Sequence, residues 1–401
     1  MSKKTKHNYP TVFIHGLGGF GQSDGLYRVV PQWGLLKPFD LDAYLNKKGY
    51  ESYFPSLGPF SGAWDRCCEL WAQLMGGTVD YGKVHAEKYG HNRYGRTYEK
   101  GLIENWGKKG NHEKINLIGH SFGGPVVKMF TDLILNGCEE EISGTPEGEL
   151  SDLFKRKKAQ RVHSVTTLSG VNNGTLLASA FGKRGMTVIT YALTGLSAAI
   201  GATPIMKVFD FHLDQWGLTV PPSELHPGNY KLRNPLEFVD KMSVYNSHQF
   251  DSVAYEMQIE VCQDLINPSQ KEGKDVYYFA RRGDVSFNAH PLYLPTLKCD
   301  PLSAVTELIT GNIIWPHLRR RKYKVRKDWK PNDGMVNVIG QSAPLTSEYT
   351  DFKSPKKVKP GIWYNMPVEE KSHLAWAGLL QNPYKYHRYF IDVIDMVNNL
   401  G

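Results

Sequence analysis

The sequence predicts an α/β fold in which a mostly parallel sheet carries helices on both faces. Two observations support this class. Short, apolar, β-prone runs alternate along the chain with helical segments. A Gly-x-Ser-x-Gly turn, residues 119–123, follows one such strand and opens a helix. The chain has 401 residues, of which 41% are hydrophobic, and this is enough for a substantial core.

The elements follow in order along the chain. Strands are expected at 11–15, 51–55, 114–118, 161–168 and 275–279. Helices are predicted over 40–48 and 125–136, because each segment ends at a glycine that can close it, Gly49 and Gly137. Residues 138–160 are charged and contain glycine, so we expect an exposed loop there.

Ser121 lies in the turn between the strand that ends at Ile118 and the helix that follows. Only small residues fit beside the serine in so tight a turn, and Gly119 and Gly123 meet this need. The turn holds the hydroxyl at the end of the sheet and points the helix N-terminus toward an oxyanion. This is the nucleophile elbow of the α/β-hydrolase fold. The alternative is a Gly/Ser-rich turn without chemistry.

The Gly-rich loop 16–21 follows the first strand, which ends in His-Gly. It suits the first half of an oxyanion hole, in which the backbone N–H groups of Leu17 and Phe122 donate together. A dinucleotide-binding loop is the rival interpretation. No G-x-G-x-x-G opens a helix here, so we favour the oxyanion hole.

A nucleophilic serine needs a histidine to take its proton and an acid to orient that histidine. In this fold the chain order is serine, acid, histidine. His373 lies in a loop just before the last helices, where the fold has its base. Asp333, in a tight turn, is the preferred acid by spacing. Asp284 closely follows the strand 275–279 and stays open as its competitor.

A second polar group comprises Asp65, His85 and His91. These residues could give three metal ligands, but a zinc site needs a fourth. On spacing alone, exposed loop histidines remain the alternative.

The segment from Met186 to Met206 has no charged residue and is long enough to cross a membrane. Glycines, a proline and threonines interrupt it, so we predict a buried or lid-forming helix pair, with a lid over 175–207 that opens onto a lipid surface.

The formal net charge of +8 is concentrated at 155–158 and 319–327. Such runs are typical of solvated loops, and no nucleic-acid-binding motif accompanies them, so nucleic acid is not an expected partner. Five scattered cysteines do not settle the redox compartment. The charged N-terminus lacks the apolar core of a signal peptide, so we expect an exported protein without its signal, with a cytoplasmic one as the alternative.

Together these residues resemble the thermophilic Bacillus and staphylococcal family of true lipases, and also clostridial esterases of that family that attack synthetic polyesters. The stretches that carry the likeness are 57–66, 76–91, 95–98, 210–218 and 332–337. The resemblance implies a single α/β-hydrolase domain over 1–401, with a zinc-binding insertion at 58–100 on which 205–220 packs, and with the lid at 175–207.

The resemblance also implies roles for particular residues. The catalytic residues would be Ser121, Asp333 and His373. The zinc ligands would be Asp65, His85, His91 and Asp214. With all four positions taken by protein, the zinc would be structural and would pin the insertion to the segment after the lid.

Some positions depart from the family pattern. Phe122 stands where those lipases carry glutamine, which we expect to alter the pocket wall but not the backbone donor. Ala375 and Asn382 stand where they carry acidic calcium ligands, and these losses put a calcium site in doubt.

The sequence therefore predicts a serine ester hydrolase that forms an acyl-enzyme and acts on lipid or other apolar esters, with transient contact to a lipid interface. A short-chain carboxylesterase or polyesterase whose lid ignores interfaces is the first alternative, and an acyltransferase is the second. A non-catalytic protein that binds anionic surfaces is the alternative from a different class. The sequence leaves the oligomeric state open.

Overall fold

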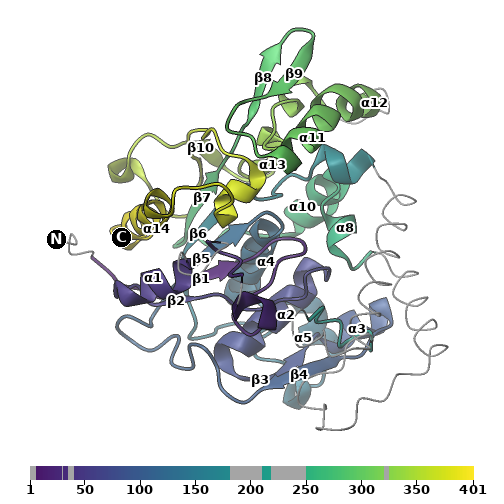
Figure 1. The fold of residues 1–401 in the computed structure, drawn as a ribbon. Coiled ribbons are helices and arrows are strands. Elements are labelled where there is room, and N and C mark those ends of the chain that lie inside the picture. Colours follow the sequence, from purple (N-terminus) through teal and green to yellow (C-terminus); the bar gives the residue numbers. More distant parts are fainter. Residues whose placement is uncertain (1–5, 29, 35–39, 181–209, 218–249, 320–324) are drawn as a thin grey trace.

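A central sheet of seven parallel strands organises the chain (Figure 1). The computed structural model describes residues 6–28, 30–34, 40–180, 210–217, 250–319 and 325–401. The strand order is β10-β11-β7-β6-β5-β1-β2, and every neighbouring pair is parallel. The strands are β1 (Thr11–Ile14), β2 (Ser52–Tyr53), β5 (Ile115–His120), β6 (Val162–Leu168), β7 (Tyr277–Arg281), β10 (Tyr349–Asp351) and β11 (Trp363–Asn365). The predicted α/β class is confirmed.

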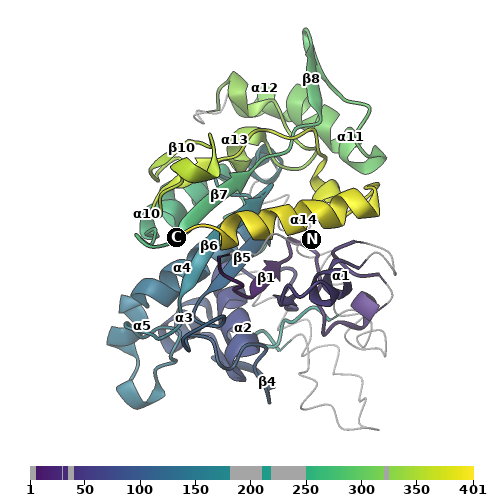
Figure 2. The same ribbon diagram turned by 90° about the vertical axis from the view of Figure 1, so that its left-hand side faces the viewer.

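Helices cover both faces of the sheet, so its middle strands are buried along their whole length. On one face α2 (Ala63–Met75) and α4 (Gly123–Asn136) pack against alternate residues such as Val12 and Ile14. On the other face lie α1 (Leu41–Lys47) and α14 (Pro383–Asn398) (Figure 2), and Phe13 belongs to the core cluster that their apolar side chains form. The alternation along β1 follows from the two-residue period of a strand.

Smaller elements extend this core at two ends. The other described α-helices are α3 (Lys83–Tyr89), α5 (Glu139–Gly144), α8 (Val253–Glu256), α9 (Ile259–Val261), α10 (Asn267–Ser269), α11 (Pro301–Ile309), α12 (Trp315–Arg319) and α13 (Val338–Gln341). The hairpin β3 (Gly77–Asp80)–β4 (Tyr94–Tyr98) lies at the bottom of both views, and β8 (Ser286–Ala289)–β9 (Leu292–Pro295) at the top (Figures 1 and 2).

The segment 138–160 is not the exposed loop that its composition predicts. It contains α5, and Leu153 and Phe154 are buried in the main core. The carboxylate of Glu141 accepts hydrogen bonds from the N–H groups of Val84 (3.2 Å) and His85 (2.8 Å), at the N-terminus of α3. The buried charge of Glu141 thus serves a helix start that favours a negative group, while Glu139, Glu140 and Arg156 are exposed as the composition predicts.

Most of the predicted lid falls outside the described residues, including all of the apolar segment 186–206. Among the residues that the structure describes, no helix is both long and apolar enough to cross a membrane.

Buried His163 on β6 leads to a prediction about acid stability. Burial lowers its pKa to about 4, and its Nε2–H donates to the carbonyl of Val397 (2.8 Å). In the unfolded chain a histidine titrates near 6.5, so between about pH 6.5 and 4 only the unfolded chain gains this proton. We expect His163 to remove roughly 2–3 kcal/mol of the free energy of unfolding over that interval. Urea unfolding at pH 7 and pH 4.5 measures the loss.

The matched variants are His163→Gln and His290→Gln, the latter at the exposed tip of the hairpin β8–β9. The loss between the two pH values should shrink in His163→Gln and stay at the wild-type size in His290→Gln. An undiminished loss in His163→Gln would show that other groups cause it.

Candidate active site and metal-binding group

Ser121 occupies a strained turn at the end of β5. Its φ is +57°, in the left-handed region that non-glycine residues rarely adopt. A Cβ on Gly119 would lie 2.2 Å from the carbonyl oxygen of Gly123, and a Cβ on Gly123 would lie 2.4 Å from that of Ile14. Backbone on both sides leaves no room for a side chain. The turn has the tight geometry of a nucleophile elbow.

Asp333 and His373 form a buried pair. The Nδ1 of His373 lies 2.9 Å from Asp333 Oδ2. The other carboxylate oxygen accepts from the N–H groups of Met335 (3.0 Å) and Val336 (2.8 Å). The backbone N–H of His373 also donates to the carbonyl of Asp333 (2.9 Å). These bonds orient the carboxylate and leave Nε2 of the imidazole for a further group.

His120 connects this pair to the turn of Ser121. Its Nε2–H donates to the backbone carbonyl of His373 (3.0 Å), and the two ring centroids are 4.8 Å apart. Burial, and then the neighbouring His373, hold the pKa of His120 well below its usual value, so the ring is a neutral donor. The structure therefore brings Ser121, Asp333 and His373 to one edge of the sheet. Asp284, the competing acid, instead accepts from the N–H (2.9 Å) and hydroxyl (2.6 Å) of Ser286.

The loop after β1 lies directly against the serine. A Cβ on Gly16 would be 2.5 Å from Ser121 Cβ and 2.9 Å from its Oγ. In the part of the chain that the structure describes, neither the Leu17 nor the Phe122 N–H donates to another protein group. Two backbone donors thus remain for a ligand oxygen beside Ser121.

Arg66 supports this loop from inside the core. Its Nη2–H donates to the carbonyl of His15, and its guanidinium carbon lies 5.5 Å from the centre of the Phe122 ring. Phe122 is fully buried in the main core. Its ring packs against Arg66 inside the core, and the expectation that Phe122 alters the pocket wall stays a prediction.

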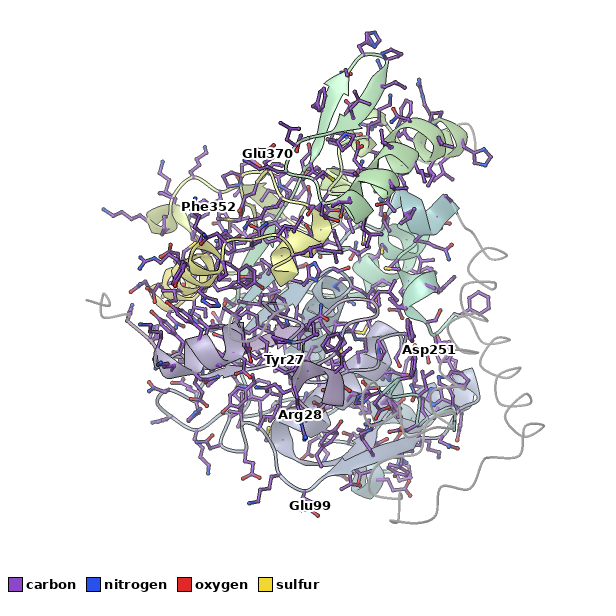
Figure 3. All side chains as sticks on the ribbon, in the orientation of Figure 1. Tyr27, Arg28, Glu99, Asp251, Phe352 and Glu370 are labelled. Carbon is purple, nitrogen blue, oxygen red and sulfur yellow. The ribbon has the colours of Figure 1, made fainter. Side chains whose placement is uncertain are left out.

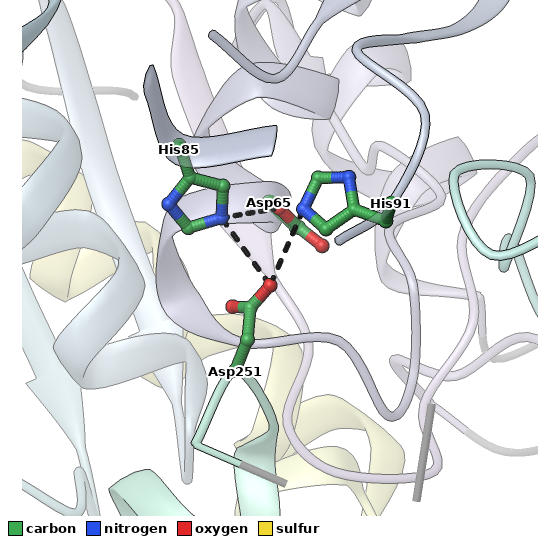
Figure 4. A group of neighbouring side chains, drawn as sticks. All are labelled: Asp65, His85, His91 and Asp251. Atoms are coloured by element: carbon green, nitrogen blue, oxygen red, sulfur yellow. Dashed lines mark hydrogen bonds and ion pairs between the residues drawn. The ribbon is translucent and has the colours of Figure 1, made fainter. Parts of the chain in front are cut away.

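Four residues form a group that could hold a metal ion (Figure 4). They are Asp65 on α2, His85 on α3, His91 just after α3, and Asp251, and their ligand atoms all lie within 4.8 Å of one another. Asp251 Oδ2 is 3.2 Å from His85 Nε2 and 3.5 Å from His91 Nε2. Asp65 Oδ1 is 3.3 Å from His85 Nε2. Asp251 lies well away from the hairpin β8–β9 (Figure 3).

The chemistry of this group fits a divalent cation. The Nδ1–H of His91 donates to the carbonyl of Asn92 (2.8 Å), and Gln215 donates to Asp65 Oδ2 (2.6 Å). The opposite atoms, His91 Nε2 and Asp65 Oδ1, are buried and make no well-formed hydrogen bond among the described residues; they face Asp251 at 3.5 Å and His85 at 3.3 Å. Burial disfavours a charged His85, but the carboxylates of Asp251 and Asp65 outweigh it and raise its pKa to about 10. Two carboxylates and two imidazole nitrogens that face one another are a ligand set that a divalent cation can bind.

The structure puts Asp251, and not Asp214, in this group, which corrects the ligand set that the resemblance implies. Asp214 accepts two hydrogen bonds from Arg96 (2.7 and 2.8 Å), and Asp210 accepts a third (2.7 Å). Arg96 lies on β4, so these bonds attach residues 210–217 to the hairpin β3–β4. No motif surrounds Asp251, which is 166 residues from His85 in the chain, so spacing could not identify it.

The order of the parallel sheet and the strand–serine–helix turn define an α/β-hydrolase. Within that class, the chain belongs to the family described as "Lipase-like, C-terminal domain", whose model matches residues 7–389.

Several known proteins are similar to the chain. Lipase 1 of Staphylococcus aureus is 31% identical over 377 residues, which are 93% of this chain and 51% of that protein. The chain thus spans about half the length of the curated relatives it matches. EstA from Clostridium botulinum has a TM-score of 0.80 and 33% identity, covering 100% of this chain and 89% of that one. The Staphylococcus hyicus lipase has a TM-score of 0.81, covers 98% and 96%, and at 24% identity shows likeness of fold.

Proposed function

We propose that this protein hydrolyses carboxylic esters, with Ser121 as nucleophile, His373 as general base and Asp333 as orienting acid. The observation that carries the proposal is the buried pair of Asp333 and His373, which His120 ties to the turn of Ser121. Membership of the lipase-like family supports the same activity.

In the proposed mechanism, His373 Nε2 takes the hydroxyl proton of Ser121 while Oγ attacks the ester carbonyl. The N–H groups of Leu17 and Phe122 stabilise the oxyanion. His373 then gives its proton to the leaving alcohol, and an acyl-enzyme remains. Water attacks the acyl group after losing a proton to His373, and the carboxylic acid leaves as Ser121 regains its proton. Asp333 stays ionised throughout and fixes the histidine tautomer.

We further propose that the ion held by Asp65, His85, His91 and Asp251 is zinc. The set of two nitrogen and two oxygen ligands suits tetrahedral zinc, and it leaves no position open for substrate. The ion would be structural and would join the insertion 58–100 to the segment that begins at Phe250. From the family resemblance we also propose one hydrolase domain over the whole chain, with a lid at 175–207.

The test is hydrolysis of p-nitrophenyl esters from acetyl to palmitoyl by the wild type, Ser121→Ala and Ser269→Ala. Ser269 is an exposed serine on α10 and serves as the matched control. We expect Ser121→Ala to lose at least 10⁴-fold in kcat, by analogy with other serine hydrolases, while Ser269→Ala keeps wild-type rates. A peak at medium or long chains favours a lipase, and a peak at acetyl or butyryl favours a short-chain esterase or polyesterase. Full activity in Ser121→Ala would refute the mechanism.

A further inference from the structure

Helix α11 has an inverted amphipathic arrangement, with apolar side chains exposed and polar side chains buried. Its outer face carries Leu302 (59% exposed) and Val305 (57% exposed), whereas Ser303 and Glu307 are fully buried. Helices on the surface of soluble proteins normally have the opposite arrangement, with the apolar stripe turned to the core. Burial of its polar face cannot explain why the outer face is apolar.

Neighbouring elements enlarge this apolar surface. The hairpin β8–β9 lies beside α11 at one end of the molecule (Figures 1 and 2), and α11 packs against β9. Among the described residues, eight of the eighteen exposed large hydrophobic side chains belong to this region, so the clustering is not a general property of the described surface. The α11 patch consists of Phe287, Leu292, Leu297, Leu302, Val305, Leu308, Ile309 and Ile313. Exposed apolar surface gathered in this way marks an interaction site.

The patch borders the candidate active site. A Cβ on Gly334, the residue after Asp333, would lie 2.8 Å from Ser303 Cα. The side chain of Asp300 caps the start of α11 by accepting from the Ser303 N–H (3.0 Å). The buried face of α11 thus packs on the loop that holds the proposed catalytic acid, while its apolar face points outward beside that loop.

Basic side chains flank the patch. The π-helical turn 310–314 continues α11 into α12, where the sequence enters the basic run 319–327. Of that run, Arg319, Arg326 and Lys327 are described and exposed. Lys330 lies 4.3 Å from the ring centre of Trp315, which keeps its charge at the same end. Apolar side chains with a basic border are typical of surfaces that bind anionic lipid.

We propose that the α11 patch docks the enzyme onto a lipid–water interface that carries negatively charged headgroups, and so places the active site against aggregated ester. The patch enters the boundary between headgroups and acyl chains, and the basic border contacts the anions. The inference rests on the proposed ester hydrolase activity for its purpose, but the binding step needs no catalysis.

The test measures vesicle binding in the inert Ser121→Ala background. Vesicles of phosphatidylcholine, and of phosphatidylcholine with phosphatidylglycerol at about 3:1, are sedimented with the protein. The variant Leu302→Gln/Val305→Gln/Ile313→Gln removes the three most exposed large apolar side chains of α11 and the following turn. We expect it to lower the partition coefficient at least tenfold. The matched control is Tyr349→Gln, an exposed aromatic residue on the edge strand β10, which should bind as its parent does.

A second variant tests the charge. Arg326→Gln/Lys327→Gln should lose the preference for phosphatidylglycerol and its sensitivity to salt, while binding to pure phosphatidylcholine stays the same. In the active background, the triple variant should hydrolyse soluble p-nitrophenyl acetate at the wild-type rate and vesicle-borne ester at least tenfold more slowly.

Failure of docking and failure of the proposed activity are distinguishable. If the protein binds vesicles but hydrolyses no ester, the proposed activity is refuted and the docking proposal still stands. Equal vesicle binding by the triple variant and its parent would overturn the docking proposal. A wild-type dimer that the triple variant dissociates would assign the patch to a second copy of the chain. A fall of several degrees in the Tm of the triple variant, with vesicle binding equal to that of its parent, would indicate that another segment of this chain covers the patch.

Discussion

Replacing Asp333 by asparagine is expected to lower kcat for ester hydrolysis by about 10⁴-fold, the size seen when the acid of a serine-hydrolase triad is neutralised. The amide keeps the shape of the side chain and loses the charge. Asp333 Oδ2 now accepts from His373 Nδ1, so an amide NH₂ in its place would favour the wrong tautomer. The hydrogen bonds from Met335 and Val336 should still hold the turn. The measurement is kcat on p-nitrophenyl butyrate, with circular dichroism to confirm folding.

Asp284→Asn is the matched control, since spacing makes Asp284 the competing acid. Its carboxylate accepts from the N–H and hydroxyl of Ser286, and the oxygen of an asparagine side chain can accept both. We expect less than a threefold change in kcat. If Asp284→Asn loses about 10⁴-fold in kcat while Asp333→Asn keeps its activity, Asp284 and not Asp333 is the orienting acid.

Loss of the proposed ion is expected to lower the melting temperature by about 10 °C or more, because metal binding to a folded site is also folding free energy. Asp251→Asn should release the ion, since it removes a carboxylate that faces both His85 and His91. A chelator added to the wild type should produce a similar fall in Tm. Elemental analysis by mass spectrometry gives the number of ions per chain and identifies the metal.

Asp214→Asn separates this site from the neighbouring ion pair. It weakens the contact with Arg96 and lowers stability, yet it should keep one ion per chain. An ion retained by Asp251→Asn and lost by Asp214→Asn would restore the ligand set that the resemblance implies.

Features set by local backbone geometry could be predicted from the sequence. The turn around Ser121 needs glycine at positions 119 and 123, and the Gly-x-Ser-x-Gly pattern shows this need in the local sequence. Alternating strands and helices likewise indicate a parallel sheet, because the period of each element is a local property. Asp333 and His373 lie where the expected chain order puts them, and the structure pairs them.

Features set by tertiary contacts could not be predicted in this way. Asp251 joins the metal-binding group from a distant and featureless stretch, whereas Asp214 sits in a distinctive motif that serves an ion pair. Residues 138–160 look solvated in composition, but Glu141 caps a helix that precedes it in the chain. The outward apolar face of α11 has the same periodicity as an inward one, so its direction depends on what the helix packs against.

Asp65 and Arg66 are consecutive residues on one turn of α2, and their side chains contact different parts of the structure. Asp65 belongs to the metal-binding group, while Arg66 holds the His15 carbonyl and stacks on Phe122, beside the two proposed oxyanion donors. Release of the proposed ion is therefore expected to shift Arg66, and with it the loop that carries the proposed oxyanion donors. If so, loss of the proposed esterase activity on heating and release of the proposed ion should occur at the same temperature, and that temperature should rise with the concentration of free metal.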